Sequence, residues 1–297
     1  MESQRLNPDR TTGHHQNTLE VFAAFLKLGL TSFGGPIAHL GYFRNEFVQK
    51  RQWVSDGQFA QLLAICQFLP GPASSQLGFC LGLLRGGWAG ALAAFAAFTL
   101  PSALLLSWFA QIAPQLSGPI GSAVIHGLKL VALVVVAHGL LGMAGKLCTD
   151  TSRRVIAVLA AVLIVVVGGV WLQIAIILMG AFMGLILLDD VNDIPESVLP
   201  VDYGRKTGWS LLAIFVLLLV CLPLFAHGSI TLLAAFEAFY RAGALVFGGG
   251  HVVLPFLEYA LVDPGWLAKD DFMAGYGAAQ AVPGPMFSLS AYLGSHM

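Results

Sequence analysis

Short runs of glycine and proline interrupt otherwise apolar segments of this sequence, and their chemistry suits an anion. Phe33-Gly34-Gly35-Pro36 and Pro70-Gly71-Pro72 stand in the first part of the chain, and an FGGG and a second PGP run follow near its end. Proline removes a backbone donor and clashes with the preceding turn, so we expect these segments to break into half-helices. The unpaired N–H groups and the positive dipole end at a half-helix N-terminus favour an oxyanion.

We therefore expect the backbone at these runs to face a common cavity, with Pro36 and Pro72 in the first turn of their half-helices. The backbone residues expected to bind the anion are Gly34, Gly35, Gly71, Ala73, Gly248, Gly249, Gly250 and Gly284. The alternative is that the glycines only allow close packing of helices. Four such runs in one chain favour the binding site.

Serine and glutamine side chains at the PGP runs add hydroxyl and amide donors. Ser74, Ser75 and Gln76 follow the first run, and Ser288 follows the second at the position that matches Ser75. We include all four among the substrate-binding candidates. The alternative is that a serine in a membrane helix bonds back to its own backbone.

Two cations lie inside apolar segments, where a charge is costly and suggests a function. Lys27 and Arg241 each stand six residues before the phenylalanine of an FGG run. The alternatives are that each side chain reaches the membrane interface or is paired. Glu237 stands one turn before Arg241 and is well placed to pair with it. Ala23 stands at the corresponding position before Lys27, so an anion role is favoured more for Lys27 than for Arg241.

Two histidines follow the FGG runs, and either is a candidate for proton coupling because histidine titrates near neutrality. They are His39 and His251, which occupy non-equivalent positions. The alternative is that one or both are only hydrogen-bonded. Glu46 and Glu258 lie near the following loops, where they could exchange protons or be solvated, and we expect both to be solvated.

The sequence carries no signature of an enzyme or of a cofactor. HExxH, GxSxG and paired carboxylates within the apolar segments are absent, and so is a Walker motif, which excludes ATP as the direct driver. Net charge is −1, so nucleic acid is not an expected partner. The four cysteines (Cys66, Cys80, Cys148 and Cys221) are scattered without a CxxC pair, and we interpret them as free thiols. No metal site is predicted.

Composition places these residues in a membrane protein. The chain has 297 residues, of which 57% are hydrophobic and 10% charged, and its mean hydropathy is +0.78. A soluble domain carries about 25% charged residues. The apolar runs do not alternate as in a barrel, so we predict an all-α multi-span helical bundle. The candidate segments are 19–43, 58–84, 87–112, 121–145, 154–169, 171–188, 209–227, 230–256 and 271–294.

The distribution of positive charge predicts the orientation. The basic loop residues share the cytoplasmic side if 19–47 and 58–84 are re-entrant hairpins, and the N-terminus is then cytoplasmic as well. If both segments cross fully, Arg44, Lys50 and Arg51 lie outside, which the rule disfavours. Residues 1–18 lack the apolar run of a cleavable signal, so insertion is expected to begin with the first apolar segment.

The chain also repeats itself. Residues 22–36 align without gaps to 236–250, at an offset of 236 − 22 = 214, with seven of fifteen positions identical. After a one-residue gap Trp53 matches Trp266, and QFLPGP matches QAVPGP. In the predicted orientation copy one starts in the cytoplasm and copy two outside, so we expect inverted repeats around a central site. If 154–188 is one helix instead of two, the copies become parallel.

The repeat defines four parts of the chain. They are a polar cytoplasmic N-terminus (1–18), a first half (19–188), a cytoplasmic linker (189–208) and the start of a second, inverted half (209–297). Copy one continues far beyond its PGP run, whereas copy two stops soon after its own. We therefore expect the natural protein to be longer than this chain.

The chain resembles the chromate ion transporter family over residues 20–294. The resemblance rests on FGGP with its short charged loop, followed by QFLPGPASSQLG, FGGGHVVLP and QAVPGP. The resemblance implies a multi-pass protein of the bacterial cell inner membrane that exports chromate and confers chromate resistance. Our first hypothesis is secondary active transport of chromate by alternating access, with sulfate as a competitor. A homodimer is a further expectation, because transporters with broken helices often dimerise. The alternative is an oxyanion or sulfate transporter, or an anion channel, of the same fold.

Overall fold

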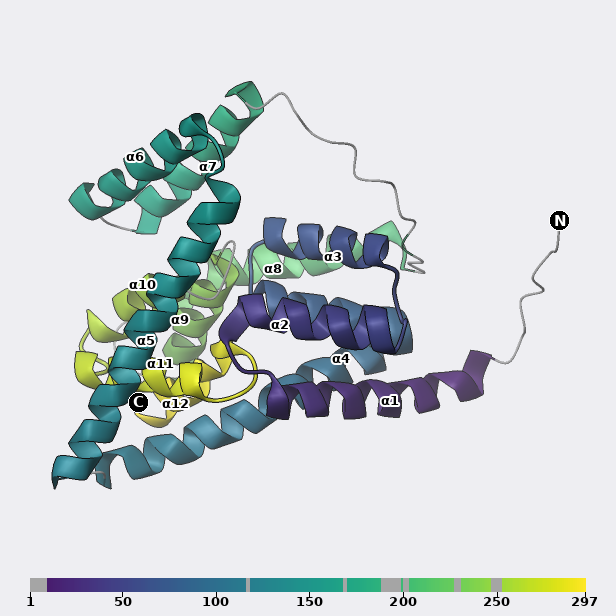
Figure 1. Ribbon diagram of the computed structural model, residues 1–297, viewed down its shortest axis with the longest axis horizontal. Helices are drawn as coiled ribbons and strands as arrows, with labels where there is room; N and C mark the ends of the chain where they lie inside the picture. The colour runs from purple at the N-terminus through teal and green to yellow at the C-terminus, as the bar shows by residue number, and fades with distance from the viewer. Residues whose placement is uncertain are drawn as a thin grey trace. The chain divides into compact units, whose positions relative to one another are not determined.

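The computed structural model describes residues 10–115, 118–167, 170–187, 199, 203–226, 231–246 and 253–297, and every regular element in these ranges is a helix (Figure 1). This confirms the predicted all-helical fold. The α-helices are α1 (Arg10–Thr31), α2 (Gly35–Phe43), α3 (Asp56–Phe68), α4 (Ala73–Ile112), α5 (Gly118–Leu147), α6 (Thr151–Val167), α7 (Val170–Leu187), α8 (Arg205–Phe225), α9 (Leu232–Ala244), α10 (Val253–Leu257), α11 (Lys269–Ala281) and α12 (Leu289–Ser295). The π-helices are η1 (Arg44–Lys50) and η4 (Glu258–Val262), and η2 (Ala113–Gln115) and η5 (Met286–Ser288) are 3₁₀ turns.

The chain packs into two compact units. One unit is Met1–Leu133 with Ser197–Met297, and the other is Val134–Glu196. The smaller unit contains the last part of α5, together with α6 and α7, which pack on each other. Asp150 starts α6 by accepting a hydrogen bond from the Arg153 N–H at 2.8 Å, as an N-terminal capping residue does. All the candidate site residues belong to the larger unit.

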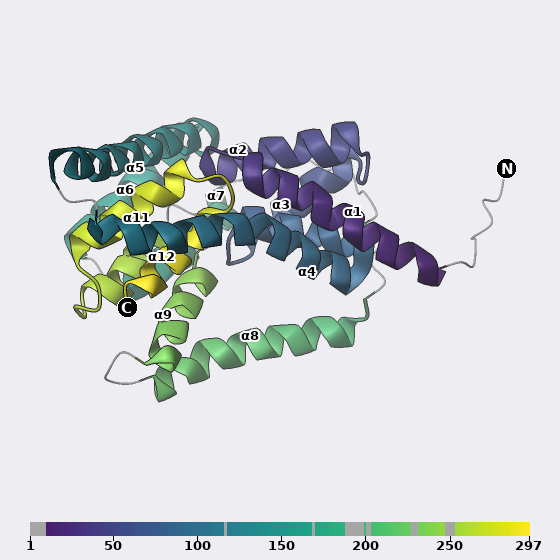
Figure 2. The same ribbon diagram turned by 90° about the horizontal axis from the view of Figure 1, so that it is seen from below.

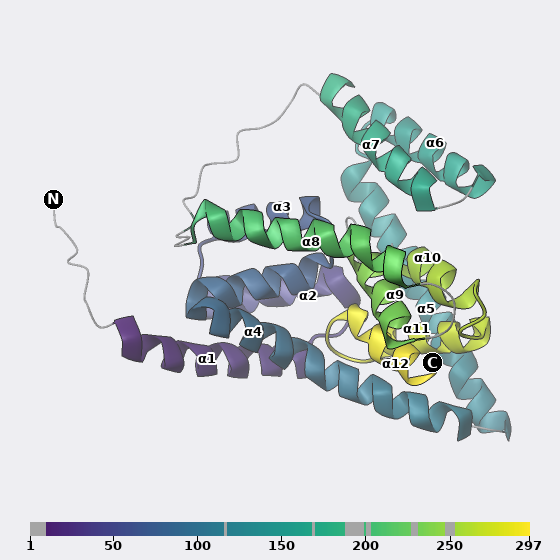
Figure 3. The same ribbon diagram turned by 180° about the vertical axis from the view of Figure 1, so that it is seen from behind.

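Helix α4 is two helices that meet at Gly86–Gly87, where both glycines have non-helical backbone angles. The first helix therefore runs over 73–85 and the second over 88–112. The boundary predicted between segments 58–84 and 87–112 falls at this turn. Helix α1 packs along α4 (Figures 1 and 3).

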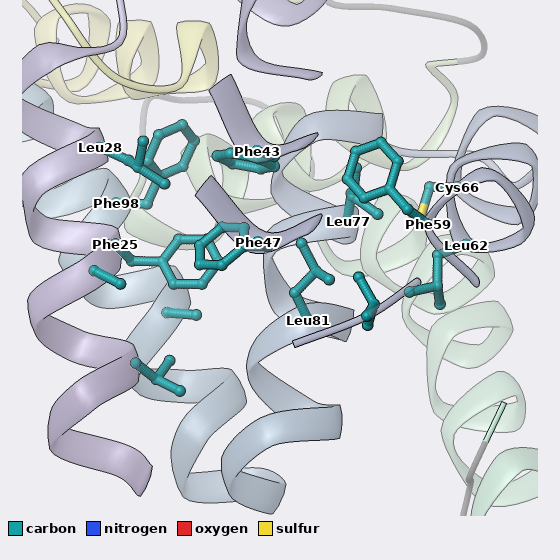
Figure 4. Packing of buried hydrophobic residues seen from close by; sticks show 14 of the residues in the cluster. Phe25, Leu28, Phe43, Phe47, Phe59, Leu62, Cys66, Leu77, Leu81 and Phe98 are labelled. Carbon is teal, nitrogen blue, oxygen red and sulfur yellow. The ribbon is translucent and has the colours of Figure 1, made fainter. Parts of the chain in front are cut away.

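The contact between α1 and α4 depends on a glycine and an aromatic cluster. A Cβ atom on Gly29 would lie 2.8 Å from the carbonyl oxygens of Ala97 and Phe98, so only glycine allows this approach. Beside it, the Phe25 ring stacks on Phe47 at 4.8 Å and meets Phe43 edge-on at 5.6 Å (Figure 4). Aromatic pairs at such distances favour packing of α1, α2 and η1 beyond the contact area alone.

The glycine and proline runs coincide with helix ends. Helix α1 ends at Thr31 and α2 begins at Gly35, and α3 ends at Phe68 before α4 begins at Ala73. Pro36 lies in the first turn of α2, as predicted, whereas Pro72 is the residue before the first turn of α4. The predicted segments 19–43, 58–84 and 271–294 are consequently each divided between two helices. Residues 247–252, with the FGGG run, lie outside the described residues.

The first and last parts of the chain have the same succession of elements. In copy one the order of elements is α1, α2, η1, α3, a PGP run and α4. In copy two α9, α10, η4, α11, a PGP run and η5–α12 follow in the same order. Figure 2 shows α9 leading from the end of α8 toward these C-terminal helices.

Two helices in the described part of the chain are long and apolar enough to cross a membrane. They are Ala73–Gln115, which contains the Gly86–Gly87 turn, and Arg205–Phe225. None of the residues in the most apolar stretch of α8 is buried against the rest of the protein. An apolar stretch of this length that the rest of the protein does not cover is consistent with a lipid-facing span.

Candidate anion-binding site

The two PGP runs are held by hydrogen bonds that each copy makes to the other. The Gly71 N–H donates to the Val246 carbonyl at 2.7 Å, and the Gly284 N–H donates to the Ser32 carbonyl at 3.0 Å. These positions are equivalent in the repeat, since 71 + 213 = 284 and 32 + 214 = 246. The contact is therefore reciprocal, as at a two-fold interface. It satisfies backbone groups that the helix breaks would otherwise leave unpaired.

Glycine is required at both donors for a stereochemical reason. Gly71 has φ of 127° and Gly284 has φ of 107°, a region that residues with a Cβ rarely adopt. A Cβ on Gly284 would also lie 2.7 Å from Ser102 Oγ. The PGP motif thus places a donor in the one backbone conformation that reaches the other copy.

A cavity of about 280 Å³ lies beside these hydrogen bonds, and equivalent residues of both copies line it. Pro72 and Ser75 come from copy one, and Pro285 and Ser288 occupy the matching positions in copy two. The remaining lining residues are apolar or small, apart from two hydroxyls, and come from α4, α9, α10, η5 and α12: Phe95, Thr99, Ala103, Phe239, Ala242, Gly243, Val253, Leu257, Met286, Phe287, Leu289 and Ser290. Among these described residues there is no charged side chain.

The polar groups of the cavity are hydroxyls and the start of α4. Ser288 Oγ donates to the Pro285 carbonyl at 2.7 Å, and Ser290 Oγ donates to the Phe287 carbonyl at 2.9 Å. Thr99 Oγ1 is buried and makes no hydrogen bond. Helix α4 begins with no side-chain cap, so its first N–H groups have no partner from its own turn. The cavity is therefore mostly apolar, with a few hydroxyls in its lining, and lies next to the uncapped start of α4.

Thr99 is a lining residue that the sequence interpretation missed. The available signal was Pro101, which lies inside α4 two residues further on. A proline within an apolar helix marks a distorted turn. Ser102 Oγ donates to the Thr99 carbonyl at 3.0 Å and packs against Gly284, which ties this turn to the second PGP run.

The other backbone and amide candidates lie around the cavity without lining it. Gly34 and Gly35 are at the start of α2, where Gly35 approaches the Gln280 amide. Gln76 Nε2 donates to the Pro70 carbonyl at 2.8 Å and so braces the first PGP run. Ser74 is buried in the first turn of α4. The candidates Gly248, Gly249, Gly250 and His251 lie outside the described residues.

Both candidate cations are paired with carboxylates and do not line the cavity. Arg241 Nε lies 2.8 Å from Glu237 Oε1, the partner expected from its spacing. Lys27, whose side chain is 59% exposed, has Nζ at 3.7 Å from Glu46 Oε2. The partner of Lys27 thus comes from η1. The residue one turn before Lys27 in its own helix is Ala23, which has no carboxylate.

The prediction that both glutamates are solvated is wrong for Glu46, which is buried, whereas the Glu258 side chain is 36% exposed and pairs with the exposed Lys269. Only 7% of the Glu46 side chain is exposed, because Arg51 Nε contacts it at 2.9 Å in addition to Lys27. Glu258 Oε1 lies 2.8 Å from Lys269 Nζ. This contact raises the pKa of Lys269, chiefly through the hydrogen bond to Glu258.

His39 is fully buried, and the Ser32 backbone is its hydrogen-bonding neighbour. Its ring meets Phe98 edge-on at 5.3 Å. The hydrogen-bonded alternative and a role in proton coupling therefore both stay predictions for His39.

Comparison with known proteins places this arrangement in a family. The model of the family described as chromate transporter matches residues 19–185 and 233–297. The chain belongs to the chromate transporter family. The two matched segments begin close to the starts of the two repeat copies. Because this is a family of transporters, the expectation that the chain is not an enzyme is confirmed.

Three relatives illustrate the similarity. The probable chromate transport protein of Synechococcus elongatus is 32% identical over 91% of this chain and 67% of its own length. The chromate transport proteins of Pseudomonas aeruginosa and Cupriavidus metallidurans are 28% and 26% identical over 93% and 97% of this chain, and over 65% and 71% of their own lengths. The chain thus spans about two thirds of the length of these relatives. No solved structure matches it.

Proposed function

We propose that this chain is the main part of a secondary active transporter that exports chromate across a bacterial inner membrane by alternating access, with its N-terminus in the cytoplasm. The observation that carries the proposal is the cavity at which the PGP runs of both copies meet. Family membership and the chromate transport proteins among its relatives support chromate as the cargo. Sulfate, a tetrahedral dianion of similar shape, is the expected competitor.

The cavity chemistry suits a dianion that must be released again. Moving a charged group out of water is costly unless hydrogen bonds replace those of the solvent. The unpaired Thr99 hydroxyl, Ser75 and the uncapped start of α4 supply such donors. Binding by neutral donors avoids a close ion pair, so the anion is held without a large barrier to its release. The volume of about 280 Å³ is near the lower end of ligand pockets, which start at about 300 Å³.

The reciprocal hydrogen bonds suggest how access would alternate. If the copies are inverted repeats, rocking one against the other exposes a site between them to each side in turn. The Gly71–Val246 and Gly284–Ser32 contacts join the copies next to the cavity. We propose that these two contacts act as the pivot, because a hydrogen bond of backbone groups can tilt while it remains formed.

Transport into inside-out vesicles tests the proposal. An exporter should accumulate chromate in such vesicles in a saturable way, and excess sulfate should reduce the rate. Thr99→Val removes the unpaired hydroxyl while keeping the side-chain shape, so uptake at low chromate should fall. Thr207→Val makes the same change at an exposed position of α8 and should leave uptake unchanged.

Three outcomes would contradict parts of this proposal. No uptake by vesicles that contain folded protein excludes chromate as the cargo. Uptake that rises linearly with concentration, without saturation, indicates a channel. Equal uptake by the Thr99→Val and Thr207→Val variants excludes Thr99 from the anion path.

A further inference from the structure

Two cysteines that stand apart in the sequence meet in a second cavity. Cys66 is on α3 and Cys80 on α4, so they flank the first PGP run. Both line a cavity of about 320 Å³, together with apolar and aromatic side chains such as Ile65 and Phe79. Three residues (Pro72, Ser75 and Phe95) line this cavity and the anion cavity alike. The thiols therefore lie in the wall next to the proposed transport site.

The two thiols form a pair. Both are free, Cys66 is 2% exposed, and the Cys66 and Cys80 side chains interact directly with each other. Figure 4 shows Cys66 on α3 beside Phe59 and Leu62. The sequence interpretation of the cysteines as free thiols is confirmed, and the contact between these two is an addition from the structure. Cys148 and Cys221 do not line this cavity.

The surroundings restrict what the pair can bind. A tetrahedral metal site needs about four ligands, and the described residues contain no group of three or more potential ligands of this kind. The walls are apolar, so a charged ligand would lose its hydration without compensation. A neutral compound that needs two sulfurs and has an apolar group fits both conditions.

We propose that Cys66 and Cys80 form a dithiol site for neutral, monosubstituted trivalent arsenicals. The reaction is R–As(OH)₂ + 2 Cys–SH → R–As(S–Cys)₂ + 2 H₂O, in which each sulfur replaces one hydroxyl and each thiol proton leaves in water. Arsenic stays trivalent, so no oxidant or reductant is needed. The organic group R lies against the aromatic wall formed by Phe79 and Phe95.

Bridging the two sulfurs has a mechanical consequence, which rests on the proposed function. The bridge joins α3 to α4 across Leu69–Pro72, the segment that contains the Gly71 donor. A rigid link there prevents α3 and α4 from moving relative to each other. Chromate uptake should therefore stop when the bridge forms and recover when it is removed.

The binding test uses phenylarsine oxide with the full chain purified in detergent. Intact mass spectrometry should show one phenylarsenic group per chain, with the loss of two hydrogens. A monothiol should leave the adduct in place, whereas a dithiol such as dimercaptopropanol should remove it. Cys66→Ala and Cys80→Ala should each weaken retention by roughly 100-fold or more, because two linked bonds act together.

Matched variants separate this site from the other thiols. Cys148→Ala/Cys221→Ala should keep the adduct, and Cys66→Ala/Cys80→Ala should lose it, with gel filtration used to verify that each variant is folded. An adduct that survives in the second double variant, or that a monothiol removes from the unmodified chain, overturns the site.

The measurement of chromate uptake tests the mechanical link separately from the measurement of arsenical binding. Uptake lost with the adduct and restored by dimercaptopropanol supports the link across the PGP run. An adduct that leaves uptake unchanged overturns that link. A chain that forms the adduct but never transports chromate contradicts the proposed function and not the dithiol site.

Discussion

The two repeat copies share a backbone plan but differ in how charge is arranged on it. In copy one the buried Glu46 contacts Lys27, Lys50 and Arg51 at 2.9–3.9 Å. The position that matches Glu46 in copy two is Ala260 (46 + 214), so no such centre exists there. Both copies nevertheless donate from their PGP runs to each other in the same way. The backbone contact thus belongs to the common architecture, whereas the position that matches Glu46 carries no carboxylate in copy two.

The cluster of copy one extends to the turn in α4. Glu20 contacts Arg51 at 3.2 Å and Arg85 at 2.9 Å, and both guanidinium groups lie over the Trp53 ring at 5.6 and 5.5 Å. Arg85 directly precedes the Gly86–Gly87 turn. The network therefore joins α1, η1 and the α4 turn through charged and cation–π contacts.

One ion pair is present in both copies with its charges reversed. Arg44 contacts Asp56 at 2.8 Å in copy one, and Glu258 contacts Lys269 at 2.8 Å in copy two. Arg44 and Glu258 are the first residues of the two π-helices, and Asp56 and Lys269 are the first residues of α3 and α11. The contact is therefore retained in both copies, while the positions of its acidic and basic partners are exchanged.

The largest expected effect comes from the shared backbone contact. Gly71→Ala and Gly284→Ala each force a Cβ into a positive-φ position, at a cost of about 1–3 kcal/mol, and crowding by Gln76 or Ser102 adds about 1–3 kcal/mol. Thermal unfolding in detergent should show a large fall in Tm for both variants.

Gly142→Ala is the matched control, because nothing lies within 4 Å of the added Cβ and the position is inside a helix. It should keep or slightly raise Tm. If only one of the two PGP variants is destabilised, the copies are not equivalent at this contact.

The next largest expected effect is a change in the KM for chromate, and it distinguishes Ser75 from the equivalent Ser288. Ser75→Ala should raise the KM for chromate roughly 10- to 100-fold, since a hydrogen bond to a charged group contributes about 1.5–3 kcal/mol. Ser288→Ala should raise it less, because Ser288 Oγ already donates to the Pro285 carbonyl. Initial rates of vesicle uptake measure both. A larger effect at Ser288 would reverse the assignment of the main donor.

The charge cluster should make copy one more sensitive to loss of a carboxylate. Glu46→Gln leaves three cations without their shared partner, and we expect a loss of about 1–3 kcal/mol, toward the lower end because the cations are partly exposed. Glu237→Gln removes a carboxylate with the single cation Arg241 and should cost less. Equal losses in urea unfolding would mean that the cluster does not act as a unit.

The smallest effect concerns the reversed ion pairs. The Lys269 pKa is raised above 10.5 by Glu258, so its contribution is complete below the unfolded pKa and is lost as pH rises through the folded pKa. The Arg44–Asp56 pair contains no lysine and serves as the matched control. Glu258→Gln should therefore change Tm slightly at pH 9 and less at pH 11.5, and Asp56→Asn should change it equally at both. A Glu258→Gln effect that is the same at both pH values would contradict this.

Much of the helical architecture follows from local sequence. The apolar composition and the proline and glycine runs predict helices and the places where they end, because the missing N–H of Pro36 and the positive φ of Gly71 and Gly284 are properties of single residues. The repeat likewise needs only the comparison of residues 22–36 with 236–250. Arg241 with Glu237 is equally local, since spacing along one helix brings the two side chains together.

Contacts between distant residues were decided only by the tertiary structure. The Gly71–Val246 and Gly284–Ser32 hydrogen bonds, the burial of Glu46, the place of Thr99 in the cavity and the pairing of Cys66 with Cys80 all depend on which helices pack together. Spacing in the sequence predicts which residues share one helix face, but not which face of another helix meets it. The sequence by itself thus determined where the helices end and that the chain repeats. The packing of the copies decided which distant residues contact each helix end.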